Sequence, residues 1–273
     1  MWQTSIFGID MYHLFYYFFI YSFLGWISEC VKVFVETKKL VNRGFISGPI
    51  CPIYGVGAVA LVLLLGSVKN IFLLFLIGVV VTSVLEYVTG YILEKLFHSK
   101  WWDYSDKPFN LQGRICLFNS LLWGVSSIVI VKFIQPLMEK LVNIIPSSVG
   151  EVFGVIILIL FTLDEAHAIY TALNLNLRLK SITQISEEIK LRAENIKSHK
   201  LPTAAEELQI ILSNLTERYE NLLSKRIFSH NRLIKAFPRL KSIHFESTLD
   251  EVKKRATIKK KAATKKKVAT KKK

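Results

Sequence analysis

The stretch NIFLLFLIGVVVTSVLEYVTGYIL, residues 70–93, decides the fold class of this sequence, and Glu86 is its one charged residue. A helix needs about 20 mostly apolar residues to cross the hydrocarbon core of a bilayer. The stretch therefore predicts a membrane-spanning helix. Outward from it, four more apolar stretches lie near residues 11–34, 44–68, 115–134 and 152–173.

Five such stretches in one chain predict an all-α integral membrane protein, built as a five-span helical bundle. Basic residues are absent before the first stretch, present after it at Lys38, Lys39 and Arg43, and frequent again after the third and fifth. Because cytoplasmic loops carry an excess of Lys and Arg, we expect the N-terminus outside and the C-terminus in the cytoplasm. The expected location is the plasma membrane, with several passes and with membrane lipids as partners.

The composition excludes several classes of protein. Hydrophobic residues make up 51% of the chain, and the formal net charge is +15. These values exclude a disordered chain and an ordinary soluble enzyme. Three cysteines are too few for a secreted disulfide framework. Residues 253–273 contain twelve Lys or Arg and no acid, so they supply +12 of the charge.

The domain organisation follows from the change along the chain from apolar to basic residues. We expect a five-span transmembrane domain at 1–174, a cytoplasmic helical hairpin and basic amphipathic segment at 175–240, and a disordered lysine-rich tail at 241–273. Leu175, Leu179, Ile182 and Ile189 recur at the spacing of a coiled-coil seam, and Pro202 separates two helices. We expect the hairpin both to pack on itself and to serve as a docking or dimerisation element, because an isolated two-helix hairpin buries little surface. The tail favours anionic lipid as its partner over nucleic acid.

Ionisable residues inside the apolar stretches are the candidate site. Glu29, Glu86 and Glu165 lie in the first, third and fifth stretches, and Arg43 and Arg114 stand just before the second and fourth. A charge within a span is costly unless it is paired or hydrated. Two interpretations stay open: ion pairs that lock helix ends together, or a polar pocket, open to the cytoplasm, that binds a substrate or couples a proton.

Two loops carry further signals. Glycines and prolines within 48–57 delay the second helix, which gives either a tight re-entry turn or backbone amides free to bind an anion or water. Trp101 and Trp102 predict an aromatic anchor at the membrane interface. Asp103 and Asp106 are weak candidates for a metal site, and we assign no metal, cofactor or catalytic residue.

Several long motifs resemble a known family, the putative ABC-transporter type IV (CmpB-like) permeases of Firmicutes, over roughly residues 10–175. They are Gly25-Trp-Ile-Ser-Glu29, Asn42-Arg-Gly-Phe45, Gly48-Pro-Ile-Cys-Pro-Ile-Tyr-Gly55, Trp102-Asp-Tyr-Ser-Asp106 and Gly113-Arg-Ile-Cys-Leu117. The resemblance implies a membrane protein involved in transport. The chain has no Gly-x-x-x-x-Gly-Lys phosphate loop, so an ABC permease of this kind needs a separate ATPase subunit. Five spans are few for one permease, so a homodimer is expected.

The sequence therefore predicts a permease-like transporter component with a cytoplasm-facing polar site and no ATPase of its own. A non-enzymatic role is favoured. One alternative is a membrane-embedded enzyme or lipid-binding protein that uses Asp103, Asp106 and the same carboxylates. Another is a membrane scaffold that recruits partners through the hairpin and tail. The substrate and the direction of transport stay open.

Overall fold

A computed structural model describes residues 2, 4–198, 202–225 and 228–255. The chain divides into two compact units. Unit 1 comprises residues 1–96, 100–170 and 235–240, and unit 2 comprises residues 97–99, 171–234 and the segment from 241 onward. The strands are short two-residue pieces: β1 (Ser5–Ile6), β2 (Ile9–Asp10), β3 (Ser99–Lys100), β4 (Asn110–Leu111), β5 (Ile115–Cys116) and β6 (Lys241–Ser242).

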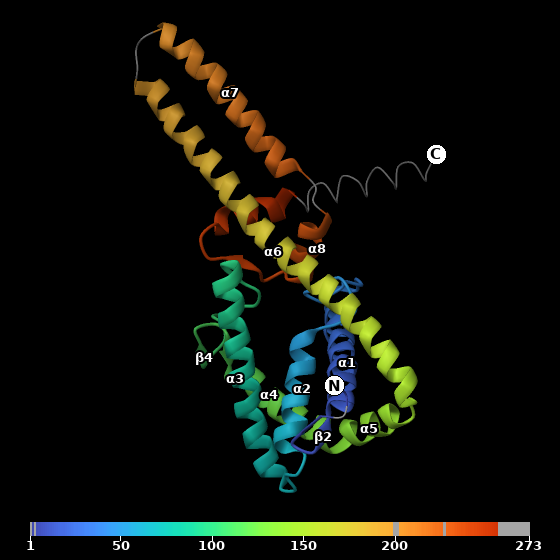
Figure 1. Ribbon diagram of the computed structural model, residues 1–273. Helices are drawn as coiled ribbons and strands as arrows, with labels where there is room; N and C mark the ends of the chain where they lie inside the picture. Colours follow the sequence, from blue (N-terminus) through green and yellow to red (C-terminus); the bar gives the residue numbers. More distant parts are fainter. Residues whose placement is uncertain (1, 3, 199–201, 226–227, 256–273) are drawn as a thin grey trace, which may run out of the picture. The chain divides into compact units, whose positions relative to one another are not determined.

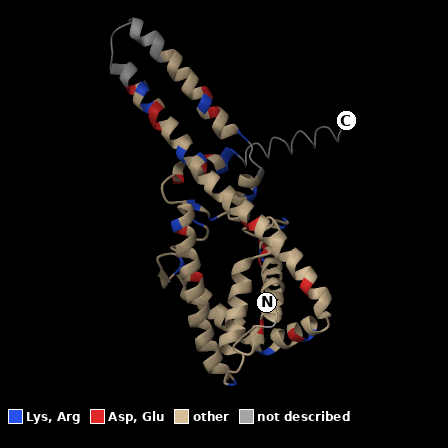
Figure 2. Ribbon diagram, viewed as in Figure 1, with Lys and Arg blue, Asp and Glu red and all other residues tan. Residues whose placement is uncertain are grey.

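Four helical stretches in the described residues are long and apolar enough to cross a membrane. They are α1 (Met11–Thr37), α3 (Ile71–Phe97), the continuous run of α4 (Leu117–Val129), η1 (Ile130–Ile134) and α5 (Gln135–Asn143), and α6 (Ser147–Ser198) (Figure 1). Figure 2 shows the absence of charge along α2 (Pro52–Leu65) and along the first half of α3. The protein is thus an all-α, multi-pass membrane protein.

The second predicted span differs from expectation. Its helix, α2, has 14 residues, which is about 21 Å at 1.5 Å per residue. That length is shorter than a hydrocarbon core of about 30 Å. The helix begins late because Pro49 and Pro52 cannot donate backbone hydrogen bonds to an earlier turn. The described residues therefore give four spans of full length, and the five-span count is not confirmed.

Close packing places the start of α2 beside the middle of α1. The amide of Cys51 donates to the carbonyl of Ser22 at 3.0 Å. A Cβ atom added at Gly25 would lie 2.2 Å from the Tyr54 ring, and one at Gly55 would lie 2.2 Å from Ser22 Oγ. Small residues permit this approach between helices. As a result, the irregular segment 38–51 runs beside the second half of α1.

A second helix pair is organised in the same way. Ser83 of α3 donates to Ser120 of α4 at 2.8 Å, and a Cβ atom at Gly78 would lie 2.6 Å from Ser127. The segment 98–116 precedes α4 and contains the β4–β5 hairpin, in which Asn110 pairs with Cys116. Gly113 has a φ of +73°, a conformation that glycine adopts without strain. Both pairs thus consist of a long helix, an irregular segment and a later helix.

Unit 2 contains the second part of α6 with α7 (Pro202–Ser224), α8 (Phe228–Ala236) and β6. In Figure 1, α7 runs back alongside α6. Leu179 and Ile182 of the predicted seam are buried, as is Leu223 of α7. The coiled coil itself and the cytoplasmic location of this hairpin stay predictions.

Part of the predicted tail is folded. Residues 246–255 are helical, Leu249 and Val252 are buried, and Arg255 pairs with Glu220 of α7. The apolar residues spaced three apart give this segment one face to bury. The rest of the predicted tail, residues 256–273, lies outside the described residues.

Candidate polar site in unit 1

Glu29 lies on α1 and is compensated by two neighbours. The Tyr54 hydroxyl donates to its Oε1 at 2.7 Å, and Arg43 Nη2 donates to its Oε2 at 3.4 Å. The side chains of Arg43 and Glu29 are 19% and 24% exposed. The Arg43 guanidinium also lies over the Phe237 ring, 5.6 Å from its centroid. The structure therefore brings together two of the predicted site residues, Glu29 and Arg43, with Tyr54 as a third member.

Asp164 on α6 has a role that the sequence did not reveal. Its Oδ1 and Oδ2 accept hydrogen bonds from the amides of Ser47 at 3.1 Å and Gly48 at 2.6 Å. The sequence left open whether this loop forms a tight re-entry turn or has backbone amides free to bind an anion or water. In the structure the anion is a carboxylate of the chain itself. Asp164 could be noted in the sequence only as a charge within a span.

Glu165 is the residue of this helix that the sequence predicts for the polar site. Its side chain is half-buried, and Oε2 is buried with no hydrogen-bond partner. It makes no ion pair with any residue that the structure describes. On α6 it is therefore Asp164, one position earlier, that contacts the loop before α2.

Glu86 on α3 is the most deeply placed of the predicted carboxylates. It is 8% exposed, its Oε1 accepts from the Tyr104 hydroxyl at 3.1 Å, and its Oε2 is buried without a hydrogen-bond partner. Burial raises the pKa of the Tyr104 hydroxyl, and the charge of Glu86 adds to the rise, so Tyr104 stays a donor. No Lys or Arg among the described residues forms an ion pair with Glu86.

Arg114 pairs with a different acid from the predicted ones. Its Nε and Nη2 donate to Glu94 Oε2 at 3.1 and 2.5 Å. Its guanidinium lies over the rings of Tyr87 and Tyr91, with centroid distances of 5.2 and 5.4 Å. Burial acts against the charge of Arg114, but the bonds and charge of Glu94 raise its pKa overall. The sequence missed Glu94 because it sits beside Lys95 at the edge of the apolar stretch.

Trp123 of α4 lies between the side chains around Glu29 and those around Glu86. Its ring meets that of Tyr54 edge to face at 5.4 Å, and its side chain also interacts with the carboxylate of Glu86. Glu29 and Glu86 are therefore linked through Tyr54 and Trp123. The result is one cluster of aromatic and carboxylate side chains contributed by α1, α2, α3 and α4.

The chain was compared with known proteins. Residues 16–169 match the model of the family described as Putative ABC-transporter type IV. The match covers more than half of the chain. The protein belongs to this family. No curated protein and no solved structure matches it.

The tryptophan loop of this family member is packed inside unit 1. Trp101 is 4% exposed and meets the rings of Phe45 and Phe237 edge to face, both at 4.9 Å. Trp102 Nε1 donates to the carbonyl of Arg114 at 2.8 Å. Trp101 is therefore packed inside unit 1, and the aromatic anchor at the membrane interface stays a prediction.

The two aspartates of this loop have separate positions. Asp103 is buried, and its Oδ1 accepts from the amide and the hydroxyl of Ser105 at 3.0 and 2.5 Å. This pattern fixes a turn. Asp106 is exposed. The described residues contain no group of three His, Cys, Asp or Glu that could hold a metal ion.

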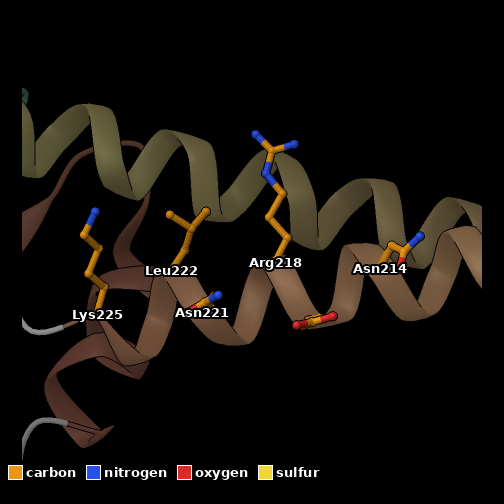
Figure 3. A pocket seen from close by; sticks show the side chains of 6 residues that line it. Asn214, Arg218, Asn221, Leu222 and Lys225 are labelled. Atoms are coloured by element: carbon orange, nitrogen blue, oxygen red, sulfur yellow. The ribbon is translucent and has the colours of Figure 1, made fainter.

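Two hollows lie elsewhere. One, of about 430 Å³, is near the first turn of α1, where His13 bonds Asp10 at 2.8 Å and Asn143 at 3.0 Å. The other, in unit 2, has about 650 Å³ and lies along α7 (Figure 3). It is lined by Asn214, Glu217, Arg218, Asn221, Leu222 and Lys225. Its charged side chains are exposed and of both signs, so they define no particular ligand.

Proposed function

We propose that the protein is a permease-like component of a membrane transporter and has no ATPase of its own. Its polar site comprises Glu29, Arg43, Glu86, Arg114 and Glu165 and opens to the cytoplasm. The observation that carries this proposal is Glu86, which is buried inside a span with one carboxylate oxygen unpartnered.

The environment of Glu86 favours a functional role over a structural one. Glu29 and Glu94 each have an arginine partner, so they fit ion pairs that hold helix ends together. Glu86 has the Tyr104 hydroxyl and the Trp123 side chain as neighbours, and no Lys or Arg among the described residues pairs with it. An acid kept in a span without a counter-charge costs stability, and such residues commonly mark a substrate or proton site. In the proposed site, Glu86 takes up a proton or contacts the transported molecule.

The energy source is a separate subunit in this proposal. Belonging to a family of ABC-transporter type supports an ATPase partner, and the chain lacks a phosphate loop of its own. The partner docks on the cytoplasmic parts. A second copy of the chain completes the permease, because four full-length spans are few for a complete translocation pathway. Anionic lipid binds the basic C-terminal segment.

A chromosomal Glu86→Gln change tests the proposal before the substrate is known. The metabolites of the growth medium are compared among wild-type cells, a deletion strain and the variant. We expect the variant to reproduce the deletion profile while its amount in the membrane equals that of the wild type. Gln keeps the shape of the side chain but cannot ionise.

The matched control is Glu151→Gln, which removes an exposed carboxylate from α6. This variant should keep the wild-type metabolite profile. A Glu86→Gln profile equal to the wild type refutes the site. Loss of the variant protein from the membrane would instead support a purely structural role for Glu86.

A further inference from the structure

The loop before α2 holds two backbone donors that already bind an anionic group. The amides of Ser47 and Gly48 donate to the two oxygens of the Asp164 carboxylate at 3.1 and 2.6 Å. Successive amides that converge on one anion form a concave anion site. Ser47 is exposed and Gly48 is half-buried, so this end of the loop lies at the surface of unit 1. The bound carboxylate of Asp164 shows that these two amides bind an anionic oxygen group.

Arg43 supplies unused donors on the same loop. Its Nη2 is directed to Glu29 at 3.4 Å, while Nε and Nη1 are buried and have no hydrogen-bond partner. Buried hydrogen-bond donors are nearly always paired in folded proteins. We therefore expect Nε and Nη1 of Arg43 to have an acceptor when the site is occupied. A guanidinium presents its donors in a fork that matches a carboxylate or a phosphate.

Asn42 brings these donors into one short turn. Its Nδ2 donates to the carbonyl of Ser47 at 2.7 Å, and its Oδ1 accepts from the amide of Gly44 at 2.9 Å. Trp26 Nε1 of α1 donates to the same oxygen at 2.8 Å. The side chain of Asn42 therefore ties the Arg43 end of the loop to the Ser47 end and anchors both to α1.

We propose that residues 43–48 bind an anionic group, a carboxylate or a phosphate, and that Asp164 occupies the two amides while no ligand is bound. This inference rests on the proposed function, because it names the substrate class of that site. The entering anion displaces Asp164 from the amides of Ser47 and Gly48 and takes the free donors of Arg43. Asp164 belongs to α6, which is one continuous helix to Ser198, so anion binding releases a contact of that helix.

The test uses inorganic phosphate and the full-length protein in nanodiscs of phosphatidylcholine, with binding followed by calorimetry. Asp164→Asn should bind phosphate about ten-fold more tightly than the wild type. The reason is that Asn offers one acceptor oxygen where Asp offers two, so it competes less well for the amides. Arg43→Gln should weaken binding about ten-fold. Glu151→Gln removes an acid from the same helix and should leave the affinity unchanged.

A second variant, Gly48→Ala, tests the proposal independently in case Asp164→Asn does not fold. A Cβ atom at Gly48 would lie 3.1 Å from Asp164 Oδ2, so Gly48→Ala should push the carboxylate away and also tighten phosphate binding. Its control is Gly57→Ala, where the new Cβ would meet Leu85 at an ordinary 3.6 Å. Equal phosphate affinity in wild type, Asp164→Asn and Gly48→Ala overturns the proposal, and so does a lack of binding in all three.

The source of the anion is decided by lipid composition. In an equal mixture of phosphatidylcholine and phosphatidylglycerol, a loss of phosphate binding assigns the site to a lipid headgroup. Undiminished binding assigns it to a soluble anion. Both results support the anion site. Because the assay measures binding alone, it stays decisive even if Glu86→Gln shows no transport defect.

Discussion

Three carboxylates of unit 1, the buried Glu86 and Glu94 and the half-buried Glu29, differ in which neighbours compensate their charge. Glu29 and Glu94 face Arg43 and Arg114, whereas Glu86 accepts one hydrogen bond from a tyrosine. Removing one member of a buried pair leaves the other charge uncompensated, which is costly. Removing the charge of Glu86 leaves no cation behind. The ion-paired carboxylates are therefore expected to stabilise the fold, whereas the proposed role of Glu86 is functional.

Glu94→Gln should destabilise the protein. Arg114 would keep its charge but lose its counter-charge at a site where the pair is 13% and 10% exposed. We expect the free energy of unfolding to fall by about 3 kcal/mol, measured by denaturant unfolding in detergent. Lys95→Gln on the same helix turn is the control and should change it little. An unaltered Glu94→Gln protein would show that the pair contributes nothing to the fold.

The sequence predicted some of these residues but few of their contacts. Glu29 and Arg43 could be named as candidates because one lies inside an apolar stretch and the other stands just before the next stretch. Asp164, Tyr54 and Tyr104 could not be found, because their partners lie on segments whose path no periodicity describes. Hydropathy identifies what is apolar, and it says little about irregular backbone at membrane depth.

Among the helices, α2 shows most clearly where hydropathy misplaces the start of a span. The apolar stretch 44–68 reads as one span, yet its first part is an irregular loop that Asn42 and Asp164 hold in place. Composition cannot tell these two cases apart, because Gly, Pro and Ile occur in both. The positions of Gly48, Pro49 and Pro52 were the available signal, and they left a re-entry turn and an anion-binding loop equally open.

Gly25→Ala tests the packing of α2 on α1. The new Cβ would lie 2.2 Å from the ring of Tyr54, which also donates to Glu29. Overpacking of this kind costs about 1–3 kcal/mol, so the melting temperature should fall. Gly57→Ala is the control, since it has room for the methyl group and should be neutral or stabilising. Equal melting temperatures of the two variants would contradict the close approach of these helices.

For the whole molecule, unit 2 supplies a prediction about pH. His230 of α8 is 3% exposed, and burial together with the charge of Arg178 lowers its pKa to about 4. In the unfolded chain the pKa of histidine is about 6.5. Between these values the unfolded state binds one more proton than the folded state, so stability is fully present above pH 6.5 and is lost as the pH falls towards 4.

His230→Gln should remove this part of the pH dependence, and His244→Gln, at an exposed position, should retain it. The measurement is the thermal midpoint of the full-length protein between pH 7 and pH 4. The loss expected across this window is about 1–3 kcal/mol. An identical pH profile in wild type and His230→Gln would mean that the buried histidine is not kept neutral by the fold.

We propose that another subunit drives transport by this chain. The most direct test is to identify the proteins that co-purify with it. The full-length protein is purified from native cells in mild detergent and examined by native mass spectrometry. We expect an ATPase subunit in fixed stoichiometry with the chain. An intact, folded preparation that repeatedly contains no ATPase would contradict it.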